Sequence, residues 1–402
     1  MRRVLTPARS ALLLAAVVLV SLPAAGQFLD DFRGPGLPKD PDGIRGWAYF
    51  SGEGNAVMDF VQGDGFASIY VDATKDRRNV WWALIKHKVS EKLDLARLRD
   101  FSHELRIEAR VRASHAPRRI NLHLNTQKTV DFHSHLMEFD LPKPNEWRVI
   151  SMTTRNFQAE PGDTVNGQLA LMDWGLGKYR LDVDYFKVDV VDPTSAGPDL
   201  GEPIPYHPPL ADPKTFAHGI AVAQDGVIDI ENPDVCLGRW RVREGDKETA
   251  LVSVGGNLSV ILRWNFGTFA GKKVAGSGLL ELTTRSVERT SKDIPDFGLI
   301  RVVEILGGEP GWNRESVTWN SLLRGAPPDL VVCPQMIIDW PVSEGDGAKT
   351  YLTIPRPVLQ RLIDGRTLGI AVRPLGAIQA AFYSREYEDG NFAARLLFNT
   401  AL

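Results

Sequence analysis

The sequence has few cysteines and no large net charge, and each of these features excludes some classes of protein. Only Cys236 and Cys333 occur in 402 residues, so the fold depends on a packed core rather than on a set of disulfides. Their spacing does not show whether these two cysteines pair. The formal net charge is −3, so no global positive field favours nucleic acid as a partner.

Motifs for nucleotide chemistry and for common hydrolase chemistry are also missing. No P-loop, dinucleotide fingerprint, nucleophile elbow or HExxH motif occurs. The glycine-rich stretch 307–311 lacks the Lys-Ser/Thr pair that would follow it in a phosphate loop. We therefore set aside kinases, NTPases, dehydrogenases and α/β-hydrolases.

Long apolar runs are rare, and the one present is at the amino terminus. Arg2, Arg3 and Arg9 precede the apolar run 11–20, and small residues follow up to Gly26. This order is typical of a secretory signal peptide, residues 1–26. The run is too short to span a bilayer. We expect a protein without a membrane span, secreted to the periplasm or the extracellular space.

A proline cluster divides the rest of the chain. It predicts a linker over 193–215, between an amino-terminal domain (27–192) and a carboxy-terminal domain (216–402), because prolines at this density disfavour helix interiors and sheet centres. The prolines are Pro193, Pro198, Pro203, Pro205, Pro208, Pro209 and Pro213.

Both domains show the period of β-strands. Residues 103–111, 119–125 and 179–191 alternate apolar and polar side chains. Further short strand candidates follow at close intervals, separated by turn residues and without alternating helices. The pattern predicts an all-β fold of two antiparallel β-sandwich or jelly-roll domains.

Two segments of the carboxy-terminal domain carry a family resemblance. These are 312–320 (WNRESVTWN) and 382–386 (FYSRE), followed by a last strand at 394–398. Their order resembles the DNRLRE-type domain, carbohydrate-binding module family 96, although that family usually has a proline where Ala393 and Ala394 stand here. The resemblance implies a jelly roll associated with carbohydrates such as alginate. Trp312 and Trp319 equally suit a sandwich core.

The amino-terminal domain resembles galactose-binding-like jelly rolls among carbohydrate-binding modules. The segments that carry this resemblance are 28–32 (FLDDF), 93–95 (LDL) and 179–185 (YRLDVDY). It implies that the first and last strands lie together and that acidic residues there hold a structural Ca²⁺, through Asp30, Asp31, Asp182 or Asp184. Solvent-facing aspartates are the alternative. No other cofactor is expected.

Histidines concentrate in the amino-terminal domain and suggest a site. The even residues of 119–125 are apolar, and so are Phe132 and Leu136 in 131–137. A hairpin with one apolar face would pair even residues with even ones. This register predicts one polar face formed by Asn121, His123, Asn125, His133 and His135.

This polar face has several interpretations. As a binding site, its amides and imidazoles would bind sugar hydroxyls, with Arg119 nearby and Trp82 or Trp174 stacked on a sugar ring. As a polysaccharide lyase, His123, His133 or His135 would remove a proton beside a uronate carboxylate. The three histidines could instead bind Zn²⁺ or Cu²⁺, or the face could be ordinary surface.

An excess of basic residues in one part of the chain indicates which kind of polysaccharide would bind. Residues 75–119 contain 13 Lys or Arg and 6 Asp or Glu, which would favour an anionic glycan if these charges cluster. We therefore expect a secreted protein that binds a polysaccharide, one that is alginate-like or otherwise carries uronate or sulfate groups. A polysaccharide lyase or a hydrolase is the alternative.

Overall fold

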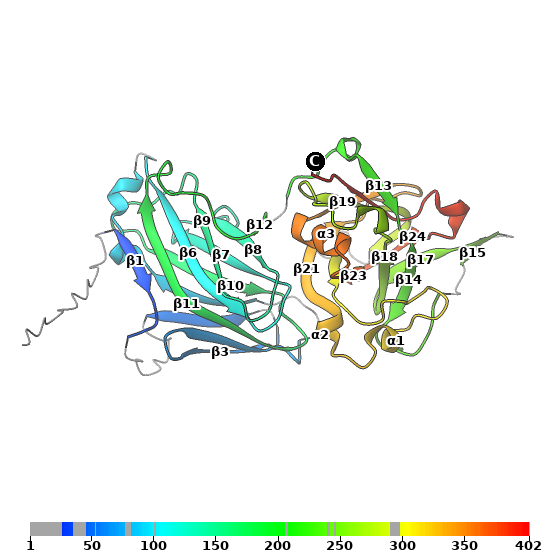
Figure 1. Cartoon of the computed structure of the whole chain (residues 1–402), viewed down its shortest axis with the longest axis horizontal. Helices are drawn as coiled ribbons and strands as arrows, with labels where there is room; N and C mark the ends of the chain where they lie inside the picture. Colours follow the sequence, from blue (N-terminus) through cyan, green and yellow to red (C-terminus); the bar gives the residue numbers. More distant parts are fainter. Residues whose placement is uncertain are drawn as a thin grey trace, which may run out of the picture.

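The computed structural model describes residues 26–34, 46–52, 54–76, 82–99, 102–205, 208–238, 242–244, 247–289 and 298–401. Apart from Gly26, the predicted signal peptide lies outside these residues. The elements are mainly antiparallel β-strands, which confirms the predicted all-β fold. Two bodies of strands lie side by side, the first formed by residues up to 204 and the second by residues from 218 (Figure 1). Within the described ranges, no helix is both long and apolar enough to cross a membrane.

The first body contains two six-stranded sheets. One sheet consists of β1 (Gln27–Asp30), β3 (Val57–Gln62), β4 (Ala67–Asp72), β6 (Glu104–Ala113), β9 (Arg148–Thr153) and β11 (Lys178–Val191), in the order β3-β4-β11-β6-β9 with β1 beside β11. The other consists of β2 (Trp47–Gly52), β5 (Trp82–Lys88), β7 (Arg118–Thr126), β8 (Leu136–Leu141), β10 (Val165–Met172) and β12 (Pro203–Ile204), in the order β12-β8-β7-β10-β5-β2. The pairing of β1 with β11 places the first and last long strands together, as the resemblance implied.

The core of the first body lies between these two sheets. In β7, Ile120, Leu122 and Leu124 are fully buried against the first sheet, where Ile107 and Val111 of β6 face them in the same cluster. Because side chains alternate along a strand, the other residues of β7 point away from this core. We call that side of the second sheet its outer face.

The second body is built on an eleven-stranded antiparallel sheet. Its strands are β13 (His218–Ala221), β14 (Gln224–Asp229), β17 (Leu251–Gly255), β18 (Leu258–Arg263), β19 (Gly278–Arg289), β20 (Leu299–Ile305), β21 (Val332–Pro341), β22 (Lys349–Ile354), β23 (Gly369–Leu375), β24 (Ile378–Tyr383) and β25 (Arg395–Phe398). A small hairpin pairs β15 (Val242–Glu244) with β16 (Lys247–Thr249). The short helices are α1 (Trp319–Leu323), α2 (Pro328–Val331) and α3 (Arg356–Ile363). A large core packs on one face of the sheet, and a smaller one around Trp312 lies beneath α1 and α2.

The proline-rich segment begins as part of the first body. Arg106 donates to the carbonyl of Pro198 (2.9 Å), the amide of Leu200 donates to Ser151 (2.9 Å), and β12 pairs with β8. Residues 198–204 are therefore attached to the first body rather than suspended between the two.

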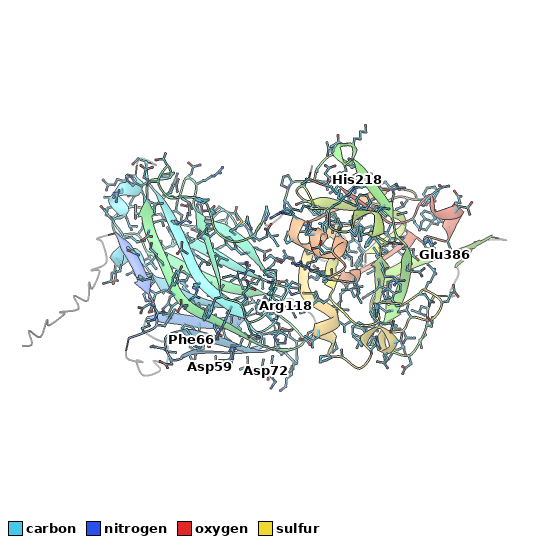
Figure 2. The ribbon with its side chains drawn as sticks, in the orientation of Figure 1. Asp59, Phe66, Asp72, Arg118, His218 and Glu386 are labelled. Atoms are coloured by element: carbon cyan, nitrogen blue, oxygen red, sulfur yellow. The ribbon has the colours of Figure 1, made fainter. Side chains whose placement is uncertain are left out.

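Buried polar contacts join the two bodies. The Arg118 guanidinium lies at the junction (Figure 2) and donates to the Asp329 carbonyl at 3.2 Å. The Arg119 amide donates to Gln335, whose amide group donates back to the Arg119 carbonyl at 3.0 Å. Arg301 of β20 pairs with Asp173 at 3.3 Å. Buried hydrogen bonds of this kind require fixed geometry, so they hold the two bodies in one orientation.

Candidate functional site

The outer face of the second sheet carries a polar strip across its middle strands. Along one row, Leu136, His123, Gln168 and Lys86 lie opposite one another on β8, β7, β10 and β5. In the next row, Asn121 of β7 lies between Glu138 and Ala170. Neighbouring strands are about 4.8 Å apart, so the step from His123 to Lys86 covers about 10 Å.

Two polar atoms of this strip have no partner. The Asn121 and His123 side chains are 2% and 7% exposed, yet Asn121 Oδ1 and His123 Nε2 form no hydrogen bond with any residue that the structure describes. Gln168 opposite His123 makes no side-chain hydrogen bond with the described residues either. Asn125 differs, because its Oδ1 accepts from Asn166 at 3.3 Å. Buried polar groups without partners are uncommon and costly, which points to a ligand that supplies the missing bonds.

The predicted register of the hairpin is wrong. Strand β8 begins only at Leu136, and His123 pairs with Leu136, so odd residues of β7 lie opposite even residues of β8. The buried alternation of Met137, Phe139 and Leu141 fixes this register, because these side chains join the core. Glu138, rather than a histidine, therefore shares the face of Asn121.

The two remaining histidines belong to the loop that precedes β8. The loop returns toward β7, where the Leu124 amide donates to the His135 carbonyl at 3.1 Å. Phe132 in this loop is 55% exposed, and its ring centre lies 6.0 Å from that of His123. The sequence pattern placed Phe132 in the core, whereas the structure presents its ring to solvent beside the polar strip. His133 is also exposed and lies 3.4 Å from Asp131.

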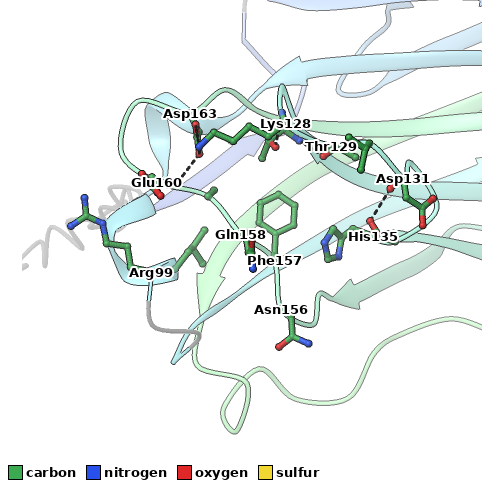
Figure 3. Close-up of a pocket in the computed structure, with 15 residues that line it drawn as sticks. Arg99, Lys128, Thr129, Asp131, His135, Asn156, Phe157, Gln158, Glu160 and Asp163 are labelled. Atoms are coloured by element: carbon green, nitrogen blue, oxygen red, sulfur yellow. Dashed lines mark hydrogen bonds and ion pairs between the residues drawn. The ribbon is translucent and has the colours of Figure 1, made fainter.

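A pocket of about 380 Å³ adjoins this loop (Figure 3). Its lining comes from residues 126–135, 156–163 and the end of the 3₁₀ turn Leu95–Leu98. The His135 ring packs on Phe157 at 4.9 Å, and Lys128 donates to Asp163 at 3.0 Å. The loop thus connects the polar strip to a second polar hollow.

Burial changes the protonation of the histidines in this region. The pKa of His123 is lowered to about 4, first by burial and then by the positive charges that His135 and His133 would carry. Burial also lowers the pKa of His135. His123 is therefore a neutral imidazole at pH 7, with a free nitrogen that can donate or accept a single hydrogen bond.

A second aromatic residue, on β5, borders the strip on the side opposite Phe132. Trp82 of β5 is partly exposed and forms an edge-to-face pair with Phe50 at 5.7 Å. The absence of a side chain at Gly52 makes room for this indole. Trp174 is fully buried and donates its Nε1 hydrogen to the Arg119 carbonyl at 2.9 Å, so the prediction that it stacks on a sugar is wrong.

Charged groups at the other end of the face are already neutralised. Arg119 pairs with Glu138 at 2.7 Å, and Asp140 pairs with Arg361 of the second body at 2.7 Å. Arg119 is therefore a structural group in this arrangement. Lys86 has no carboxylate partner among the residues that the structure describes, so it is the uncompensated charge of the strip.

The arginine-rich strand of the first sheet also has partners. Arg110 and Arg112 of β6 pair with Asp184 and Asp182, each at 2.7 Å. Both guanidinium groups lie over the Trp147 ring, at 5.0 and 4.5 Å. These two arginines of β6 are therefore held in ion pairs and are not free to bind an anionic ligand.

The four aspartates expected at a calcium site have other partners. Asp30 accepts from the Trp47 indole (2.9 Å), and Asp31 lies 3.6 Å from Arg33. Asp182 and Asp184 accept from arginines. A calcium site here stays a prediction, one that requires these carboxylates to exchange their partners for an ion. In the described part of the chain, no three His, Cys, Asp or Glu side chains are placed to share a metal.

The motif residues of the second body have structural roles. Arg314 pairs with Asp225 at 2.6 Å and with Glu386 at 2.8 Å, which joins the two motif segments. Trp312 is buried in the smaller core, and Thr318 caps α1 by accepting from the Ser321 amide. Both cysteines are free thiols.

Comparisons with known proteins extend to the fold only. No protein-family model and no curated protein matches the sequence. Among solved structures, a family 11 carbohydrate-binding module from Clostridium thermocellum, in complex with a β-1,3-1,4-mixed-linked tetrasaccharide, is 16% identical over 41% of this chain and 96% of its own, with a TM-score of 0.27. A family 4 module is 17% identical over 40% of this chain and 97% of its own, with a TM-score of 0.29.

A third similar structure extends over both bodies. It is the tandem of two family 22 modules from Paenibacillus barcinonensis Xyn10C, which is 12% identical over 94% of this chain and 98% of its own, with a TM-score of 0.26. At these low identities and TM-scores, the similarities assign no function to this chain. The resemblance of the second body to the DNRLRE-type domain stays a prediction.

Proposed function

We propose that this chain is an exported protein that binds a polysaccharide through the outer face of its second sheet. The observation that carries the proposal is the pair of buried, unpartnered atoms Asn121 Oδ1 and His123 Nε2, in line with Gln168. A sugar hydroxyl both donates and accepts, so one ring can satisfy an amide oxygen and an imidazole nitrogen together. Phe132 and Trp82 supply exposed aromatic surface on which a sugar ring can stack.

We extend the proposal to an anionic polysaccharide. Lys86 continues the row from His123 and Gln168 and has no carboxylate partner among the described residues. The acidic groups of the same face, Glu138 and Asp140, are each paired with an arginine. The charge left to attract a ligand is therefore positive, which suits a uronate or sulfate group.

The lyase interpretation requires His123 to act as a general base that removes a proton from the substrate. A base with a pKa of about 4 accepts a proton only weakly at pH 7, which makes His123 a poor general base in this state. We therefore expect His123 to contribute to binding rather than to proton removal.

A glycan array probed with the mature full-length chain tests the proposal. We expect His123→Ala and Asn121→Ala each to weaken binding to the best glycan about tenfold, the equivalent of one lost hydrogen bond. His103→Ala, which lies before β6 and outside this face, is the matched control. Equal binding by all three variants would contradict the assigned site. Release of unsaturated uronate from that glycan, followed by ultraviolet absorbance and lost in His123→Ala, would favour the lyase.

A further inference from the structure

The second body contains a cavity of about 580 Å³ that the sequence motifs do not mark. Its walls come from three separate segments: residues 223–224 beside β14, residues 263–270 after β18, and residues 362–368 at the end of α3. The volume lies in the range of small-molecule sites. The motif residues Arg314 and Glu386 do not line it.

Two buried polar groups of the cavity wall lack partners. Trp264 is 7% exposed, and its Nε1 hydrogen has no acceptor in the described ranges of the chain. Thr367 is 6% exposed, and its hydroxyl makes no hydrogen bond with the described residues. An indole N–H can only donate, whereas a threonine hydroxyl can donate and accept. A ligand that carries both acceptors and donors on one ring would satisfy both groups.

The cavity wall also has an uncompensated cation. Arg263 forms no ion pair with the described residues. Its guanidinium donates to the Pro310 carbonyl and lies 5.3 Å from the centre of the Trp312 ring. Asp364, the acidic group of the wall, has Arg366 at 3.6 Å and accepts from Gln360 at 2.9 Å. Within the cavity wall Asp364 thus has a cation beside it, Arg263 has no carboxylate partner among the described residues, and Phe266 adds a partly buried aromatic ring.

From this arrangement we propose that the cavity binds a sugar unit bearing a carboxylate, such as a uronate. The carboxylate is attracted by Arg263, and hydroxyls of the ring bond with the Trp264 indole and the Thr367 hydroxyl. Phe266 offers an apolar surface to the ring carbons. The proposal concerns a second site in the second body and does not depend on the polar strip of the first body.

Matched sugars distinguish charge from shape in this site. We would titrate the full-length chain with galacturonate and galactose, and with glucuronate and glucose, by calorimetry and tryptophan fluorescence. The expected result is saturable binding of at least one acid at millimolar concentration, at least tenfold tighter than its neutral partner. Trigalacturonate shows whether the terminal unit of a polymer enters as well as the free sugar.

Variants locate the binding. Thr367→Val removes the hydroxyl at nearly constant volume and should weaken binding of the acid about tenfold without lowering the unfolding temperature. Arg263→Met should abolish the preference for the acid over the neutral sugar. Thr353→Val on β22, equally buried and outside the cavity, is the control and should leave binding unchanged.

Several results would overturn the proposal. They are equal binding of acid and neutral sugar, absence of saturable binding by any of the four sugars, and unchanged binding in Thr367→Val. Binding lost in His123→Ala but kept in Thr367→Val would instead assign the sugar to the first body. If the glycan array shows no binding that depends on the polar strip, these sugar titrations still test the cavity on its own.

Discussion

Arg361 offers the sharpest test of how the two bodies are joined. This side chain of α3 donates to Asp140 of the first body at 2.7 Å and to Glu304 of β20 at 2.9 and 3.0 Å. The three side chains are 9%, 3% and 5% exposed. Burial alone would lower the pKa of Arg361, but the two carboxylates raise it above its ordinary value. Arg361 therefore keeps its positive charge in this buried position.

The substitution Arg361→Met keeps most of the aliphatic stem and removes the charge. It leaves two carboxylates buried without their cation, and breaking a buried pair in this way costs about 3–5 kcal/mol. Domains are commonly stable by only about 5–15 kcal/mol, so the loss is a large fraction of the total. The substitution Arg356→Met is the matched control, since Arg356 of the same helix pairs with Glu202 of the first body through side chains that are 52% and 32% exposed. Exposed pairs contribute less than about 1 kcal/mol.

Urea unfolding of both full-length variants measures the difference. We expect the unfolding free energy to fall by about 3–5 kcal/mol for Arg361→Met and by less than about 1 kcal/mol for Arg356→Met. Adding Asp140→Asn to Arg361→Met should recover part of the loss, because one buried charge is removed. Similar small losses in both single variants would show that this junction is not a buried, charge-coupled interface.

Three further predictions follow from particular side chains. The pKa of His123 is about 4 in the folded chain and about 6.5 when unfolded, so its contribution to stability is present above pH 6.5 and is lost as the pH falls toward 4. Between pH 7 and pH 4.5 the unfolding free energy should therefore fall by about 2–3 kcal/mol more in the wild type than in His123→Gln. A methyl group at Gly52 would come within 2.5 Å of the Trp82 ring, so Gly52→Ala should displace the indole and weaken glycan binding, with little effect expected if Trp82 takes no part. Thiol titration should label Cys236 in the native protein but Cys333 only after unfolding, because Cys333 is buried and burial raises its pKa; a count of no thiols in the unfolded, unreduced chain would instead indicate a disulfide.

The sequence pattern predicted strands better than it predicted their partners. The strand candidate 103–111 coincides with β6 from Glu104 onward, and 179–191 lies within β11, because alternation reports directly which side chains face the core. The same alternation rule predicted the wrong register for the hairpin formed by β7 and β8. Residues 131–141 contain one apolar set at Phe132 and Leu136 and another at the odd positions from Met137 onward, and only packing against the first sheet selects between them.

Other features depend on contacts that a linear pattern does not contain. The sequence around Trp174 does not indicate that its indole is buried and donates to the Arg119 carbonyl. The cavity of the second body brings Trp264 and Thr367 together from distant segments. The presence of polar residues in β7 was visible in the sequence, but the lack of partners for Asn121 and His123 required coordinates.

The junction between the bodies has a consequence for how a polymer would be recognised. Two sites on a flexible tether can adapt to many ligand lengths, whereas two sites held by Arg118, Arg301 and Arg361 keep one spacing. A single glycan chain that reaches both gains a high effective concentration at the second site after binding the first. That gain vanishes for chains too short or too strongly bent to reach both. Such a protein would therefore select its ligand by length and stiffness of the polymer as well as by the chemistry of one sugar.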